Sequence, residues 1–208
     1  TCLSRRKLRV RSSSIPYIMK IIENALSEDL FSRCKVECNN KLRLNQWQSS
    51  NTFWNTSLRE GIDGCTMTTP TSPQIHDEIE NELRSHLPPF PNGLMTQYYV
   101  WQPNSGIAMH NDNGKRFGAT IYLNDTWHPN SGGWFIWKDN PDFPIQEDSR
   151  AWHSQKYGQA RIAKEWNTYL PERNCMVLND QQEYHLVTRV SADGYAIRIT
   201  IQIWGIKE

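Results

Sequence analysis

The second half of the chain alternates between apolar and polar positions with the period of a β-strand. Isoleucine occupies every second position of 197–203, and residues of mixed polarity stand between and after them: Arg198, Thr200, Gln202 and Trp204. Successive side chains of a strand point to opposite faces, so this run predicts a strand with one apolar and one mixed face. Further strand-like runs are separated by turns rich in Gly and Asn: 94–101, 116–124, 133–138, 175–178 and 184–190.

Helical spacing is found in the first half of the chain. Apolar residues near helical period predict a short helix over 20–31, although Ser27-Glu-Asp-Leu could instead cap a second turn. In 74–87, apolar residues recur every fourth position from Ile75 to Leu87, which predicts an amphipathic helix that ends at Pro88. Both strand and loop fit 44–60.

Residues 139–172 follow neither pattern and contain several prolines and mixed charges. A loop of that length in a compact domain is usually functional or mobile. We interpret it as a lid or substrate-facing insert with about one helical turn near 160–166. Short strands preceded by helices predict an α+β, mainly β fold, with a barrel or sandwich core and supporting N-terminal helices.

Composition narrows the classes of function. The 208 residues suffice for one domain, which we assign to 19–208 with its core at about 94–208. With 23 Lys and Arg against 22 Asp and Glu, the formal charge of +1 argues against a nucleic-acid partner. The five cysteines are odd in number and lack Cys-x-x-Cys spacing, which favours a reducing, cytoplasmic compartment. No apolar run is long enough for a membrane-spanning helix, so no membrane partner is expected, and the oligomeric state is left open.

The segment 1–18 differs from the rest of the chain. It contains five Lys and Arg and no acid, and a new register begins at Met19. It is either a basic arm or a non-native extension of the reading frame, and we favour the extension. Without these five charges the formal charge changes from +1 to −4, since +1 − 5 = −4, which further disfavours nucleic acid.

Three residues have the chemistry of a metal site. His110 and Asp112 are two positions apart, so on an extended strand end both can reach one cation. Without a third ligand, such a pair is more often part of a turn, in which Asp112 would accept backbone hydrogen bonds, than of a metal site. His185, which lies much later in the chain in a β-like run, changes the balance. Two His and one carboxylate leave open the positions that a non-haem Fe(II) oxygenase needs, whereas a closed zinc site needs a further Cys or His nearby.

A cation completes the pattern. Arg198 follows His185 in the chain and lies on the polar face of the last predicted strand. The cosubstrate 2-oxoglutarate chelates iron through its 2-oxo acid end and needs a fixed cation for its distal carboxylate. An arginine fork supplies that cation and keeps its charge. A surface-paired strand arginine is the alternative, and the His-Asp-His set makes it the weaker one.

The order of these motifs resembles a known family. The matching residues run from Tyr98 to Trp204: Tyr98-Tyr99, His110-x-Asp112, Ile121-Tyr122-Leu123-Asn124, Trp127, Gly132-Gly133, His185, Arg198 and Trp204. This half of the chain resembles the Fe(II)/2-oxoglutarate dioxygenases, specifically the prolyl 4-hydroxylase-like branch. The resemblance implies a double-stranded β-helix, or jelly-roll, with iron held by the triad at its open end.

The resemblance also assigns the cosubstrate side. Arg198 takes the place of the residue that holds the distal carboxylate, and Tyr122 matches a tyrosine that hydrogen-bonds it. Tyr99 is similar to another cosubstrate-side tyrosine, but its offset from His110 is longer by one position. The cofactors implied are Fe(II), 2-oxoglutarate and O2, with ascorbate as an optional addition.

Two departures affect the substrate assignment. Trp134-Phe135 follow the Gly-Gly where collagen-type members commonly have Glu-Thr, and the gap from His185 to Arg198 is longer. Asp112 argues against the halogenase variant, which needs that position vacant. The implied reaction is hydroxylation of a C–H bond of a peptide or protein, with proline as the default by analogy and with succinate and CO2 released. The alternatives are hydroxylation of a small molecule or free amino acid, and a cupin-like metal-binding protein without turnover.

Overall fold

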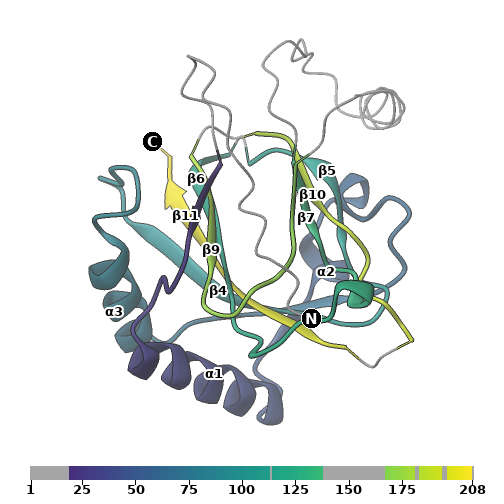
Figure 1. Cartoon of the computed structure of the whole chain (residues 1–208), viewed down its shortest axis with the longest axis horizontal. Coiled ribbons are helices and arrows are strands. Elements are labelled where there is room, and N and C mark those ends of the chain that lie inside the picture. The colour runs from purple at the N-terminus through teal and green to yellow at the C-terminus, as the bar shows by residue number, and fades with distance from the viewer. Residues whose placement is uncertain (1–18, 113, 138–166, 181–182, 194–195, 208) are drawn as a thin grey trace, which may run out of the picture.

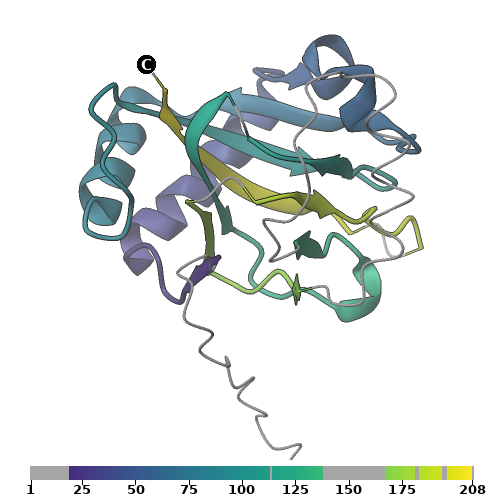
Figure 2. The same ribbon diagram turned by 90° about the horizontal axis from the view of Figure 1, so that it is seen from above.

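Two antiparallel sheets form the body of the protein, and helices cover the outer face of the larger one (Figures 1 and 2). The computed structural model describes residues 19–207 apart from 113, 138–166, 181–182 and 194–195. The larger sheet has the order β1 (Lys20–Ile22), β9 (Met176–Asn179), β6 (Lys115–Tyr122), β11 (Arg198–Ile206), β4 (Leu94–Trp101), β3 (Thr66–Pro70) and β2 (Gln48–Ser49). The smaller sheet has the order β5 (Ile107–His110), β10 (His185–Val187), β7 (Phe135–Trp137) and β8 (Asn167–Tyr169).

Strand β11 is the centre of the larger sheet and follows the predicted alternation. It pairs antiparallel with β4 and with β6, so that Thr200 lies between Tyr99 and Tyr122. Ile201 and Ile203 are fully buried on its outer face, in one apolar cluster with residues of helices α1 (Glu28–Arg43) and α3 (Pro73–Leu83). The opposite face of the sheet, which carries Arg198, Thr200, Gln202 and Trp204, therefore turns inward, toward the smaller sheet.

Between the sheets lies a second buried cluster, which is rich in aromatic residues. Its members come from both sheets: Tyr99, Trp101, Tyr122, Phe135, Trp137 and Val187 are among them. The two clusters are separated by the larger sheet, one on each of its faces. The β-rich core with supporting helices that the sequence predicts is thus confirmed.

The first helix begins later than the spacing predicts. Residues 20–22 form β1, whose backbone pairs with β9, and Asn24 adopts φ 51, which interrupts any helix there. Helix α1 starts at Glu28, and the Ser27 side chain accepts a hydrogen bond from the Leu30 amide. The expectation of a helix from residue 20 is therefore wrong, and the alternative, a cap at Ser27, is confirmed.

Other helices and strands agree in part with those predicted from the sequence. Helix α3 ends at Leu83, before the prolines, and Leu87 is still buried beyond its end. The run 44–60 contains β2, α2 (Ser50–Phe53) and the short 3-10 helix η1 (Thr56–Arg59). A second short 3-10 helix, η2, spans Pro129–Ser131. Strands β3 and β5 were not predicted. Strand β8 lies inside the segment interpreted as an insert, whereas the helical turn at 160–166, most of that insert and residues 1–18 lie outside the described residues.

None of the described helices is long and apolar enough to cross a membrane.

Candidate metal and cosubstrate site

The three predicted metal ligands meet at one end of the smaller sheet. His110 is the last residue of β5 and His185 is the first residue of β10, and these two positions pair directly across the strands. Asp112 follows in a turn that is closed by a hydrogen bond of 2.7 Å from the Lys115 amide to the Asp112 carbonyl. Strand pairing therefore brings together side chains that lie far apart in the sequence.

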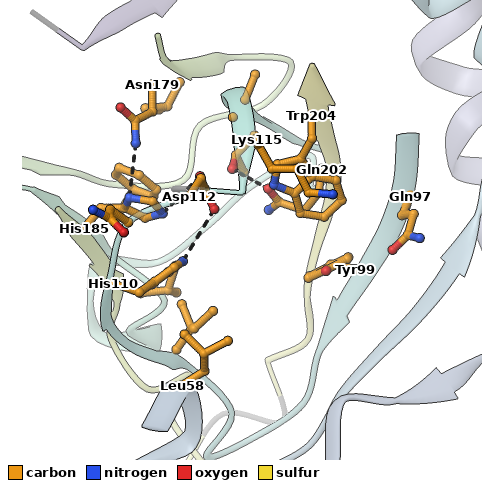
Figure 3. A pocket seen from close by; sticks show the side chains of 18 of the residues that line it. Leu58, Gln97, Tyr99, His110, Asp112, Lys115, Asn179, His185, Gln202 and Trp204 are labelled. Carbon is orange, nitrogen blue, oxygen red and sulfur yellow. Dashed lines mark hydrogen bonds and ion pairs between the residues drawn. The ribbon is translucent and has the colours of Figure 1, made fainter. Parts of the chain in front are cut away.

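The donor atoms are spaced for a shared cation (Figure 3). Nε2 of His110 lies 3.9 Å from one carboxylate oxygen of Asp112, and Nε2 of His185 lies 3.8 Å from the other. One donor atom from each residue falls within 4.8 Å of the other two. Ligands at about 2.1 Å from a common ion are separated by about 3–4 Å, so the geometry fits a metal ion.

Both imidazoles are held in the tautomer that binds metal. Nδ1 of His110 lies 2.8 Å from the Ala108 carbonyl oxygen, and Nδ1 of His185 lies 2.9 Å from the Glu183 carbonyl oxygen. A carbonyl can only accept, so each Nδ1 carries the proton and donates it. In the neutral imidazole, each Nε2 then has a lone pair on the side of Asp112, as a metal ligand requires.

A glycine on the facing strand makes room for the carboxylate. A Cβ at Gly118, in β6, would lie 2.5 Å from Oδ2 of Asp112. A side chain there would have to displace the carboxylate from its position beside the two imidazoles. Gly118 was not singled out in the sequence, although a lone Gly within a strand pattern is a known sign of close approach.

Arg198 is a buried cation that nothing in the described part of the chain neutralises. Its side chain is fully buried, and none of its three guanidinium nitrogens has a hydrogen-bond partner among the described residues. The guanidinium lies over two rings, 4.7 Å from the centroid of Trp101 and 5.0 Å from that of Tyr122. Burial lowers the pKa of Arg198 from its ordinary value, and Tyr122 partly opposes the shift.

The groups around Arg198 have the chemistry to bind an anion. The Tyr122 hydroxyl is also buried without a hydrogen-bond partner among the described residues, and burial raises its pKa. Trp101 Nε1 donates to the Thr200 hydroxyl at 3.0 Å, one step along β11. Among the described residues, Arg198 and Tyr122 offset the cost of each other's burial only in part, and a carboxylate would satisfy both. The residues present therefore fit 2-oxoglutarate.

A cavity of about 520 Å³ connects the triad with the inner face of the larger sheet. His110, Asp112 and His185 line one side of it, and Tyr99, Gln202 and Trp204 line the other (Figure 3). Arg198 and Tyr122 are not on its lining, but Arg198 precedes Thr200 and Gln202 on the same inward face of β11. The structure thus brings Tyr99 into the cavity with the triad and places Arg198 and Tyr122 further along the wall.

The fold belongs to a recognised architectural class. Two facing antiparallel sheets, with β5, β7, β8 and β10 opposite the strands around β11, form a double-stranded β-helix. No protein-family model matches the sequence, and no curated protein matches it significantly.

Solved structures, in contrast, match nearly the whole chain. A prolyl-4-hydroxylase from Pseudomonas putida is 15% identical with a TM-score of 0.62, and the match covers 92% of this chain and 94% of that one. A prolyl hydroxylase from Trichoplax adhaerens, in complex with a hypoxia-inducible factor peptide fragment, is 15% identical at a TM-score of 0.61, covering 92% and 84%. HygX from Streptomyces hygroscopicus, with nickel, 2-oxoglutarate and hygromycin B bound, is 12% identical with a TM-score of 0.59. The match covers 91% of this chain and 83% of that one. The likeness establishes the fold, and the resemblance inferred from the motif order is confirmed at that level.

Proposed function

We propose that this protein is an Fe(II)- and 2-oxoglutarate-dependent dioxygenase that hydroxylates a C–H bond in a side chain of a peptide or protein, releasing succinate and CO2. The observation that carries the proposal is the convergence of His110, Asp112 and His185 on one point. The sheet beside them holds Arg198, which has no hydrogen-bond partner among the described residues. Two imidazoles and one carboxylate suit Fe(II) and leave positions for a chelating cosubstrate and O2. When bound, the iron together with 2-oxoglutarate and O2 would supply the oxidation of the C–H bond.

The residues of the chain have separate tasks in this proposal. His110, Asp112 and His185 would hold the iron, and the backbone carbonyls behind the two imidazoles keep them oriented. Arg198 and Tyr122 would fix the distal carboxylate of 2-oxoglutarate by a fork and a hydroxyl. No general acid or base of the protein is required.

Aromatic rings would shield the reacting atoms from water. Trp54, Tyr99, Trp101 and Trp204 line the cavity, and the ring centroids of neighbouring members lie 5.7–5.9 Å apart. Such a wall excludes bulk solvent and strengthens electrostatic interactions within the site. Tyr99 belongs to this wall, and its contact with the cosubstrate stays a prediction.

The substrate assignment rests on comparison. The neighbour from T. adhaerens is described with a peptide fragment, which supports a peptide substrate, and proline is the default by analogy alone. HygX is described with hygromycin B, which supports the second candidate, hydroxylation of a small molecule. The cavity of about 520 Å³ is within the range of small-molecule sites, so its size does not separate the two.

Anaerobic titration tests the metal and the cosubstrate together. We expect Fe(II) and 2-oxoglutarate to produce a metal-to-ligand charge-transfer band with the wild-type protein. Asp112→Ala should lose the band, whereas the control His76→Ala, a partly exposed histidine on α3, should keep it. An Asp112→Ala protein that keeps the band at the wild-type concentrations, or that turns over 2-oxoglutarate fully once air is admitted, would refute the proposal.

Succinate release in air separates the candidate substrates. We expect prolyl peptides to stimulate succinate formation above the uncoupled rate, and free amino acids not to do so. Stimulation by free amino acids or other small molecules alone would favour the second candidate. Metal binding without succinate on any substrate would point to a binding protein without turnover.

A further inference from the structure

A buried asparagine lies directly behind one of the metal ligands. Asn179 is the last residue of β9 and is only 3% exposed. Its Nδ2 lies 3.2 Å from Nδ1 of His185 (Figure 3). Since Nδ1 carries the proton that is donated to the Glu183 carbonyl, this contact brings together two donors that share one acceptor.

Asn179 binds both polar groups of the Glu183 backbone. Its Oδ1 accepts a hydrogen bond of 2.8 Å from the Glu183 amide, and its Nδ2 donates one of 3.1 Å to the Glu183 carbonyl oxygen. The same carbonyl oxygen receives Nδ1–H of His185 at 2.9 Å. The asparagine thus fixes the group that sets both the tautomer and the orientation of the imidazole.

The neighbouring position in the sheet supports the second ligand. Asn179 pairs across β9 and β6 with Gly118, the glycine that leaves space for the Asp112 carboxylate. Two adjacent positions of the larger sheet therefore support two ligands, one through hydrogen bonds and one through the absence of a side chain. His110, in contrast, is oriented by the carbonyl of its own strand residue Ala108.

We propose that Asn179 is a positioning residue of the metal centre: by holding the Glu183 carbonyl it keeps the Nε2 lone pair of His185 directed at the metal. This inference rests on the proposed function only in assuming that the triad binds a metal ion. Groups that orient metal-bound histidines typically contribute about 10–100-fold to metal affinity. Without the amide, the Glu183 backbone loses two of the hydrogen bonds that position it, and the orientation of the His185 ring is less strictly fixed.

The chain contains a matched control for this residue. Asn174 is fully buried and holds the Leu26 backbone in the same two-point manner: Oδ1 accepts from the Leu26 amide at 3.0 Å, and Nδ2 donates to the Leu26 carbonyl oxygen at 2.7 Å. It also adopts φ 53, so alanine there adds backbone strain. Asn174→Ala should therefore cost at least as much stability as Asn179→Ala, away from the triad.

The experiment is Co(II) titration of the full chain, at a temperature where thermal melts show every variant folded. We expect Asn179→Ala to weaken Co(II) binding about 10–100-fold and to alter the visible d–d spectrum, with Asn174→Ala within about twofold of the wild type. Asn179→Ser, a milder change that keeps one hydroxyl, should fall in between and serves if the alanine variant does not fold. Binding by Asn179→Ala and Asn179→Ser at the wild-type level would overturn the inference.

Two further outcomes are separable. An equal loss in Asn174→Ala would mean that reduced stability, and not orientation of His185, lowers the affinity, and this too would overturn the inference. Failure of the wild-type protein to bind Co(II) or Fe(II) would instead remove the proposed metal centre itself.

Discussion

Replacement of Arg198 by Met tests whether its side chain is kept for a ligand and not for stability. The guanidinium is fully buried and lacks hydrogen-bond partners among the described residues. Desolvation of a charge costs several kcal/mol in real proteins. The contacts with the rings of Trp101 and Tyr122 return about 1–2 kcal/mol each. The net cost to the ligand-free protein is therefore about 1–3 kcal/mol.

Methionine has a similar length and carries no charge. We expect Arg198→Met to raise the free energy of unfolding of the ligand-free protein by about 1–3 kcal/mol, which for a chain of this size raises Tm by about 2–12 °C. The same change should weaken 2-oxoglutarate binding by about 2–5 kcal/mol, because it removes one partner of a buried charge pair. At about 1.4 kcal/mol per tenfold, this is about 30-fold to 4000-fold in Kd.

The assay is a set of thermal melts and urea titrations with and without 2-oxoglutarate, in the presence of Fe(II) under anaerobic conditions. The wild-type protein should gain stability from 2-oxoglutarate. In its absence the variant should be more stable than the wild type, and adding 2-oxoglutarate should stabilise the variant little. Arg189→Met, a change at a half-exposed arginine paired with Asp63, is the control and should not raise Tm. A less stable Arg198→Met protein, or one with unchanged 2-oxoglutarate affinity, would refute the reasoning.

Two further substitutions probe the site. Gly118→Ala should weaken Co(II) binding at least about tenfold, because the added Cβ would lie 2.5 Å from Asp112 Oδ2. Gly114→Ala is the control, because a Cβ there meets nothing within 4 Å, and it should leave Co(II) binding unchanged. Equal effects of the two substitutions would contradict the steric argument. Tyr122→Phe should leave the stability of the ligand-free protein unchanged or slightly higher, since the hydroxyl has no hydrogen-bond partner among the described residues, and should raise the Kd for 2-oxoglutarate about tenfold or more. An unchanged Kd in the titration would place the distal carboxylate away from Tyr122.

The strongest patterns in the sequence predicted most of the strands around the site, but not β5, which carries His110. Alternation in 197–204 depends only on the period of a strand, and it correctly put Arg198 and Thr200 on the face opposite the isoleucines. The start of the first helix was missed, because apolar residues at 20–22 fit a strand as well as a helix, and the pairing with β9 decides between them. Strand β8 is short, and within the described part of the chain it pairs with β7 alone, so its own residues give little signal.

For the site, the sequence by itself determined the candidate chemical groups: two imidazoles, a carboxylate and a cation on the polar face of a strand. Only the tertiary structure decided that they meet, since β5 and β10 pair although a long stretch of the chain separates them. It alone also shows the supports, Gly118 and Asn179, whose roles depend on what lies next to them in space. Periodicity records which face a residue occupies, whereas the distance between two faces is set by strand pairing and sheet packing, which are properties of the whole chain.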